Sequence, residues 1–413
     1  MRKNNIKLLL LLCILFSVGS IIINSCQKDT IGEKSTVKSD SYFVDSQVAS
    51  DYSEKVICSN GFQSLQSSNL NSKTTPKIIK NLRTILDKNK LAAYYMINYE
   101  EGGFVIFSAD KRVTPILAYS SDGCLPYGDA EIPANLEYWL SSVKENIESV
   151  RRNNETATEE IQFQWKNIEI GGNSYPVLKS VTPPTPCTGT FEQKGPFIST
   201  QWHQGCGFNT QLPNSAHVTG CVNGLHLDCG AAFAGCLTIA MAQVMKFHQR
   251  PTTYTWSLMP NRIPPAPYPT EPARLIHDIF YALGPPSYSC SGTAGAPSVG
   301  ASVFKSKFGY SSATYGSYNF ITVKSNLRSN RPVILGSSGG IEAHGWVCDG
   351  FQESKICVYD DDGSYLGSST FLLFHMVWGD YYPNADGWFY YKNFNPDGHN
   401  YNSNEEMIYN IIP

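Results

Sequence analysis

A proline-dense stretch near the middle of the chain limits how its 413 residues can fold. Residues 181–190 read VTPPTPCTGT. Proline has no backbone N–H and a fixed φ, so this stretch suits neither a helix interior nor a central strand. It is typical of an exposed linker, and exposed linkers are where proteases cut. We therefore place a domain boundary here, between a first domain over 76–186 and a second over 187–413.

The composition indicates a folded protein that does not bind nucleic acid. Apolar residues make up 42% of the chain and charged residues 16%, which leaves ample material for a core. The formal net charge is −3, and no cluster of Lys and Arg could neutralise a row of phosphates. Twelve cysteines are many for a cytosolic enzyme, but in an exported chain they can pair.

The N-terminus predicts export. The chain begins MRKNNIK, and residues 8–23 form an apolar run that is shorter than the roughly 20 residues of a membrane helix. The run ends in INSC, which resembles the bacterial lipobox, whose cysteine becomes the diacylated N-terminus. We expect residues 1–26 to be a lipoprotein signal peptide and Cys26 to carry the lipid that anchors the protein to the bacterial cell envelope, on the outer surface or the periplasmic side. An ordinary signal peptide that contains a cysteine is the alternative.

The first folded region contains helix and strand signals. Residues 27–75 are rich in Ser, Lys, Thr and Asn, which predicts a flexible tether. Over 78–86, apolar residues recur at a mixed spacing that favours a helix. Two strand-like runs, 92–99 and 103–108, flank the hairpin signal EEGG, and a third strand is expected over 113–119. Apolar residues then repeat every three or four positions over 135–153, which predicts an amphipathic helix.

A cysteine at the start of a predicted helix is the first candidate catalytic residue. Residues 234–248 read AGCLTIAMAQVMKFH, with apolar residues on one helical face after Gly235. Cys236 would then lie at the helix N-terminus, where the helix dipole and unpaired amides favour the thiolate. A buried cysteine held in a disulfide fits this segment equally well.

A histidine supplies the second candidate. His344 lies in GGIEAHGWVCDG, residues 339–350, where glycines precede a strand-like run. Taken singly, it is more often a structural histidine. Together with Cys236 it suggests a nucleophile and its general base, because such pairs meet in space rather than along the chain.

Several segments, in order, resemble the streptopain-type cysteine peptidases. QWHQGCGFN, residues 201–209, resembles the family segment W-x-Q-G-x-x-[YF]-N, whose Gln donates to the oxyanion, a role that falls here on Gln204. Residues 235–248 resemble the nucleophile helix, 340–350 resemble the segment with the base, although two residues lengthen it, and 401–411 resemble the last strand. Residues 102–119 resemble the family's propeptide.

This resemblance implies fold and activity together. It implies an α+β fold, with a papain-like cysteine peptidase catalytic domain behind an α+β propeptide domain that blocks the active site until it is cleaved. The implied reaction is hydrolysis of proteins or peptides through an acyl-enzyme, by an endopeptidase that needs no cofactor or metal.

The chain departs from the family at one motif. The family carries Asn-Trp-Gly-Trp-Gly-Gly, whose Asn orients the catalytic His and whose Trp shields that contact. Here residues 377–382 read VWGDYY, so Trp378 is retained but Val377 replaces the Asn. Loss of the orienting group predicts a slower enzyme, unless Asp380 replaces it. The alternative function is a catalytically weak relative that acts as a surface binding or inhibitor-like module.

Two further patterns suggest metals only weakly. Cys221, His226 and Cys229 lie close in sequence, but their spacing matches no Cys-x-x-Cys zinc pattern, and a disulfide-tied loop is the preferred interpretation. Residues 360–363, DDDG, lack the spacing and closing Glu of an EF-hand and indicate a turn.

Overall fold

The computed structural model describes residues 41–56, 77–128, 130, 132, 134–169, 189–214, 229–262, 266–289, 293, 295–337, 344–359, 365–379, 385–390 and 405–413. The predicted signal peptide with Cys26, residues 181–188 of the proline-dense linker, Cys221, His226, Asp380 and the DDDG segment lie outside the described residues. Among the described residues, no helix is both long and apolar enough to cross a membrane.

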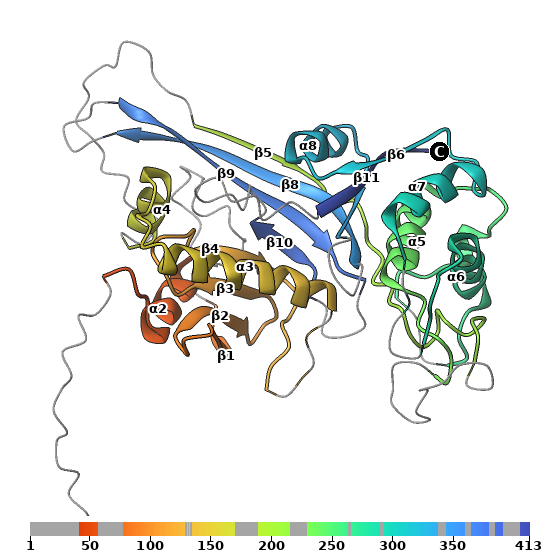
Figure 1. The fold of residues 1–413 in the computed structure, drawn as a ribbon, viewed down its shortest axis with the longest axis horizontal. Coiled ribbons are helices and arrows are strands. Elements are labelled where there is room, and N and C mark those ends of the chain that lie inside the picture. Colours follow the sequence, from red (N-terminus) through yellow and green to blue (C-terminus); the bar gives the residue numbers. More distant parts are fainter. Residues whose placement is uncertain are drawn as a thin grey trace, which may run out of the picture. The chain divides into compact units, whose positions relative to one another are not determined.

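Antiparallel strands form one large sheet. Within the described residues the sheet has 11 strands in the order β1-β2-β3-β4-β10-β9-β8-β7-β11-β6, and β5 pairs with β8 (Figure 1). The first four strands are β1 (Ile79–Leu86), β2 (Ala92–Tyr99), β3 (Phe104–Ser108) and β4 (Ile116–Ser120). The others are β5 (Thr190–Lys194), β6 (Ser312–Ser317), β7 (Val333–Ser337), β8 (His344–Tyr359), β9 (Tyr365–Val377), β10 (Gly387–Tyr390) and β11 (Glu405–Ile412).

The sheet runs without a break from the predicted propeptide into the predicted catalytic domain. The junction is the pair β4–β10, in which Tyr119 lies opposite Trp388 and Ala118 opposite Phe389. The Tyr119 hydroxyl also donates to Oε1 of Gln352 on β8 at 2.7 Å. Backbone pairing and a buried side-chain hydrogen bond therefore both join the two regions.

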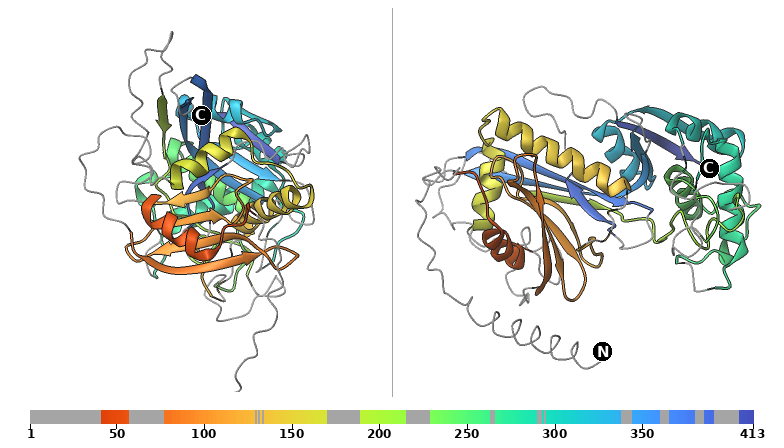
Figure 2. Two further views of the ribbon diagram at one scale, coloured as in Figure 1. Left: turned by 90° about the vertical axis from the view of Figure 1, so that its left-hand side faces the viewer. Right: turned by 60° about the horizontal axis from the view of Figure 1, so that its bottom comes forward.

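Helices cover both faces of the sheet. One face carries α3 (Ala134–Arg152) and α8 (Phe320–Arg328), and α3 contacts both β2 and β8, so it crosses the junction (Figure 2). On the other face, α2 (Ser46–Val56) and α4 (Glu159–Glu169) pack on the first strands. The remaining helices, α5 (Cys236–His248), α6 (Thr270–Leu283) and α7 (Pro297–Ser306), pack around β7, β8 and β11, with the short 3-10 helix η2 (Trp256–Leu258) beside them.

Several local predictions are confirmed and two are corrected. The hairpin β2–β3 and the helices over 134–152 and 236–248 are present. Residues 79–86, which show helical spacing, form strand β1 instead. Two register shifts in β1 disrupt the alternation that would have marked a strand. Residues 46–56 of the predicted tether form helix α2, whose Tyr52 ring lies 6.3 Å from Phe107 of the sheet.

Candidate active site

Cys236 is the first residue of α5. Gly235 before it has φ +87°, a conformation that favours glycine, and a Cβ there would lie 3.2 Å from the side chain of Thr293. Most of α5 is buried, from Leu237 to Met245. Cys236 itself is half-buried and carries a reduced thiol. The sequence therefore places this thiol at the N-terminus of a helix that is fixed in the core.

His344 begins β8, and close packing brings the start of β8 to the start of α5. Its neighbour Gly345 faces the helix, since a Cβ at Gly345 would lie 3.5 Å from Cα of Leu237 and 3.7 Å from its backbone N. The residues adjacent to Cys236 and His344 are therefore in contact. The two predicted residues, 108 positions apart in the sequence, lie at neighbouring element starts.

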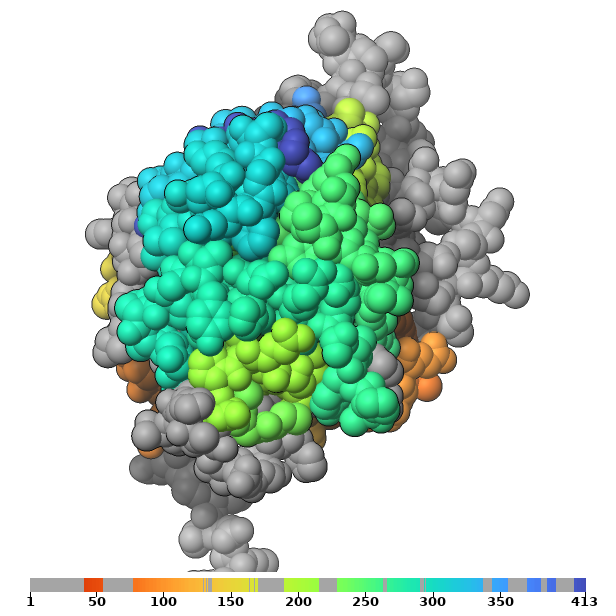
Figure 3. Space-filling model, turned by 90° about the vertical axis from the view of Figure 1, so that its right-hand side faces the viewer, coloured from red at the N-terminus to blue at the C-terminus, as the bar shows by residue number. Residues whose placement is uncertain are grey.

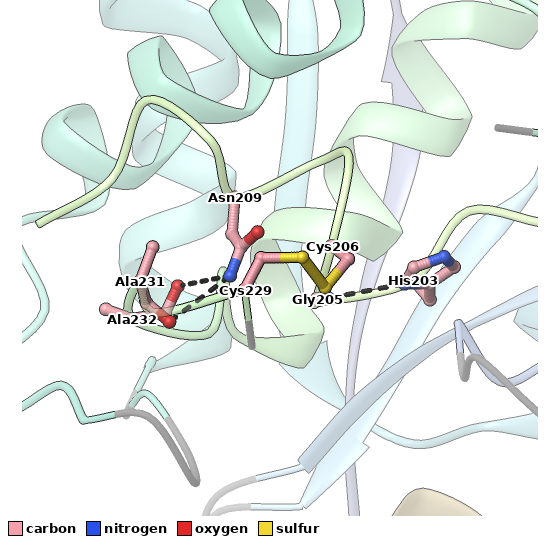
Figure 4. Close-up of a disulfide and its surroundings, with 7 residues drawn as sticks. All are labelled: His203, Gly205, Cys206, Asn209, Cys229, Ala231 and Ala232. Carbon is pink, nitrogen blue, oxygen red and sulfur yellow. Dashed lines mark hydrogen bonds between the residues drawn. A yellow bond between two sulfur atoms is a disulfide. The ribbon is translucent and has the colours of Figure 1, made fainter. Parts of the chain in front are cut away.

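Gln204 lies beside the segment that leads into α5. The backbone N–H of Ala234 donates to the Gln204 carbonyl at 3.0 Å, two residues before Cys236. Next to it, the Gly205 N–H donates to Nδ1 of His203 at 3.3 Å (Figure 4). Burial lowers the pKa of His203 to about 3, so this ring is neutral and Nδ1 can accept. The Gln204 side chain is half-buried.

Trp378 lies in a row of aromatic side chains that leads to His344. The Trp378 ring is buried, and its centroid lies 5.3 Å from that of Trp346 and 4.9 Å from that of Phe389. The ring centroid of Tyr138, on α3, lies 6.1 Å from that of Trp346 and 5.5 Å from that of His344. Side chains two residues apart on a strand point to the same face, so His344 and Trp346 both face α3. No signal in the sequence marks Tyr138, because its position on an amphipathic helix is not distinctive.

Val377 packs on the opposite face. It pairs with Val347, three residues beyond His344, and belongs to the apolar cluster that contains Leu237 of α5. Its side chain is 2% exposed. Val377 therefore lies in an apolar environment and does not pair directly with His344.

A buried acid–histidine cluster lies close to the junction with β4. Nδ1 of His375 contacts Oδ1 of Asp349 at 2.6 Å, and the other carboxylate oxygen accepts backbone N–H groups from Phe197 and Ile198. Burial lowers the pKa of His375, but the charge and hydrogen bond of Asp349 outweigh it, so the pKa is raised. Burial also raises the pKa of Asp386 to about 7, against the opposing effect of the Trp378 N–H. Nothing in the sequence distinguished these residues.

Cys229 forms a disulfide with Cys206, at a sequence separation of 23. The preferred interpretation of Cys229 as a disulfide cysteine is therefore confirmed, with a partner that the sequence did not indicate. Among the described residues, no group of three or more His, Cys, Asp or Glu side chains could hold a metal ion. His248, at the end of α5, contacts the Tyr310 hydroxyl at 3.2 Å and is part of the packing.

Two protein-family models match the chain, one in each of its two regions. Residues 43–147 match the family model described as Spi protease inhibitor, and residues 202–389 match that of the Peptidase C10 family. Residues 202–389 belong to the Peptidase C10 family. The streptopain-family resemblance found in the sequence, including its propeptide, is thereby confirmed. Gln204, Cys236, His344 and Trp378 all lie in the Peptidase C10 region, and Tyr138 lies in the inhibitor region.

Related proteins agree with this assignment. The chain is 22% identical over 367 residues to the thiol protease/hemagglutinin PrtT of Porphyromonas gingivalis, covering 78% of the chain and 37% of PrtT. It is 26% identical over 304 residues to streptopain of Streptococcus pyogenes serotype M1, covering 62% of the chain and 67% of streptopain. The chain thus spans little more than a third of PrtT.

A solved structure shows the same fold. A fragment of prointerpain A from Prevotella intermedia superimposes with a TM-score of 0.54 at 18% identity, covering 81% of this chain and 99% of the fragment. The expected α+β fold, with a propeptide domain before a papain-like catalytic domain, is thereby confirmed.

Proposed function

We propose that this Peptidase C10 chain is the zymogen of an exported cysteine endopeptidase that hydrolyses peptide bonds of proteins or peptides. The observation that supports the proposal is that the chain segments carrying three predicted residues meet near the N-terminus of α5. Cys236 begins the helix. The Gln204 carbonyl accepts a hydrogen bond from the N–H of Ala234, just before the helix. Gly345, next to His344, packs against Leu237 of the helix.

The proposed reaction passes through a thioester. The Cys236 thiolate attacks the scissile carbonyl carbon, while the Gln204 side chain and the Cys236 backbone N–H donate to the oxyanion. The His344 imidazolium gives its proton to the leaving amine. His344 then takes a proton from water, whose oxygen attacks the thioester, and the carboxylic acid product leaves with the thiol regenerated. No cofactor is needed for any step.

The inhibitor region keeps the enzyme latent in this proposal. Tyr138 of α3 contacts the His344 ring at 5.5 Å, on the face of the sheet opposite α5. A histidine held on this face is turned away from the helix that carries Cys236. Removal of the propeptide would free the imidazole to turn toward the thiol, with Trp378 and Trp346 packed beside it.

The domain assignment follows from the same proposal. The lipoprotein signal peptide would cover residues 1–26, with Cys26 as the lipid attachment site and the protein anchored to the bacterial cell envelope. The inhibitory propeptide would extend to about residue 186 and the catalytic domain from 187 to 413. Helix α2 packs on the propeptide sheet, which supports an inhibitory domain that begins near residue 42 rather than at 76.

The test is intact mass over time for protein from residue 27 onward, beside its Cys236→Ala variant, under mild reduction. The proposal expects only the parent to lose a piece of the propeptide's size. If neither converts, a trace of another protease is added to trim both, and Cys236 of the parent is probed with a thiol label. A trimmed parent that neither reacts with the label nor cleaves peptides would contradict the enzyme and favour a binding module.

A further inference from the structure

The Cys206–Cys229 disulfide lies in the loop that carries the proposed oxyanion donor. Cys206 is two residues after Gln204, and Cys229 is seven residues before Cys236. The bond therefore connects the Gln204 loop to the segment that leads into the nucleophile helix (Figure 4). Cys206 is 7% exposed, whereas Cys229 is exposed and accessible to a reductant.

The Gln204 loop has no regular secondary structure to hold it. Residues 201–209 contain no helix or strand. Most of these residues are buried, with Trp202 and Phe208 at 0% exposure, and the yellow-green part of the chain that includes them borders green residues in Figure 3. A loop without a helix or strand ladder depends on individual contacts for its position.

Several contacts hold this part of the chain against the segment before α5, among them the Ala232 N–H, which donates to the Pro213 carbonyl at 2.8 Å. Besides the disulfide, the Asn209 amide donates to the carbonyls of Ala231 and Ala232 at 3.2 and 3.3 Å (Figure 4). The Ala234 N–H donates to the Gln204 carbonyl at 3.0 Å. Each such hydrogen bond can open locally. The disulfide is the covalent link in this set.

We propose that the Cys206–Cys229 disulfide is a positioning element that holds Gln204 in place to donate to the oxyanion. This inference rests on the proposed function, because it assigns a role only if Cys236 forms a tetrahedral intermediate. A donor must lie at hydrogen-bond distance from the oxyanion before the charge forms, and the loss of one such donor costs about 10²- to 10³-fold in kcat. Opening the disulfide would therefore reduce acyl transfer without removing the nucleophile or the base.

The arrangement gives reductants two opposite effects. Mild reduction keeps the Cys236 thiol available, which activates the enzyme. Stronger reduction by dithiothreitol opens Cys206–Cys229, giving two thiols while the dithiol is oxidised to its cyclic disulfide. This second reaction releases the Gln204 loop and lowers the rate of hydrolysis.

The first experiment is a double-mutant cycle in the mature enzyme. Gln204→Ala is made in the parent and in the disulfide-free variant Cys206→Ala/Cys229→Ala, and kcat and KM are measured with a peptide amide. Alkylation of Cys236 by iodoacetamide is measured in parallel, because that reaction forms no oxyanion. Cys348→Ala is the matched control, since it removes a buried cysteine of β8 outside the loop.

The expected result is non-additive. Gln204→Ala lowers kcat by about 100-fold in the parent and in the Cys348→Ala control, but less than tenfold in the disulfide-free variant, whose Cys236 alkylates at the parental rate. An equal Gln204→Ala effect in both backgrounds, or loss of alkylation together with hydrolysis, overturns the positioning role. A mature parent that neither alkylates at Cys236 nor hydrolyses peptides overturns the proposed function itself, so the two failures are distinct.

If the disulfide-free variant does not fold, a second measurement on the unmutated enzyme tests the same inference. The native mature enzyme is titrated with dithiothreitol, and the state of each cysteine is followed by differential alkylation and peptide mass mapping. The inference expects kcat to fall in step with the opening of Cys206–Cys229 while Cys236 alkylation stays constant. A kcat that does not change as this disulfide opens overturns it.

Discussion

The ring centroids of Tyr138 and His344 lie 5.5 Å apart, and the two ring planes are inclined at 36° to each other. Tyr138 belongs to the region that matches the Spi protease inhibitor, and His344 belongs to the Peptidase C10 region. One propeptide side chain therefore contacts the proposed general base directly. In the proposed function, this aromatic pair is the contact through which the propeptide holds the imidazole.

Tyr138→Ala is expected to raise the alkylation rate of Cys236 in the unprocessed chain. An aromatic pair contributes about 0.5–1.5 kcal/mol, so its loss should increase the population of released imidazole about 2- to 10-fold. The rate is measured with iodoacetamide and mass spectrometry before any cleavage. Tyr138→Phe keeps the ring and should behave as the parent, and Tyr127→Ala, at an exposed propeptide tyrosine, serves as a surface control. Equal rates for all four proteins would contradict the role of Tyr138.

The thiols of Cys236 and Cys348 should differ sharply in reactivity. Cys348 is 0% exposed, and burial together with the nearby Asp349 carboxylate raises the pKa of its thiol well above the ordinary value. At pH 7.5, iodoacetamide should label Cys236 of the mature enzyme and leave Cys348 intact, as read by peptide mapping. Both should react in urea. Equal labelling in the folded protein would be inconsistent with this assignment.

Val377→Asn should not improve the enzyme. The Val377 side chain packs with Val347 and Leu237 in an apolar cluster, where a buried amide without partners costs about 1–3 kcal/mol. We expect a loss of that size in urea unfolding of the Cys236→Ala zymogen, and no increase in kcat/KM of the mature enzyme. Val377→Thr keeps the side-chain shape and should lose less stability. A tenfold gain in kcat/KM for the Asn variant would instead identify Val377 as the lost orienting residue.

Asp386 should make the zymogen less stable as the pH rises. Its pKa is about 7 when folded, against about 3.9 for an unfolded Asp, so the folded state binds more protons between these values. Its contribution is therefore fully present below about pH 4 and is lost as the pH rises to 7.

The measurement for Asp386 is thermal unfolding in the Cys236→Ala background. The Tm of the parent relative to Asp386→Asn should fall by a few degrees between pH 4 and 7 and then level off. Asp51→Asn, at an exposed carboxylate of α2, should show no such trend. A parent-minus-variant difference that rises with pH would have the wrong sign and would refute the prediction. The charged groups around Asp386 are His375, Asp349 and Asp122 of the propeptide.

Local patterns predicted local structure well where one signal dominated. The amphipathic repeat over 135–153 gave α3, and the EEGG turn between strand-like runs gave the hairpin β2–β3. The prediction for β1 was wrong because its register shifts disturb the two-residue period. Helix α2 was missed because a short polar helix gains its stability from packing on the sheet rather than from its own sequence.

The sequence by itself determined which residues are chemically able to act. It supplied the thiol at a helix start, the histidine at a strand start and the family segments that include Gln204 and Trp378. Tertiary structure alone decided the Cys206–Cys229 bond, the contact of Tyr138 with His344, the junction of β4 with β10 and the buried group around Asp386. These relationships join segments far apart in the chain. They are set by the burial of whole helix and sheet faces, which cannot be predicted from any short segment of the sequence.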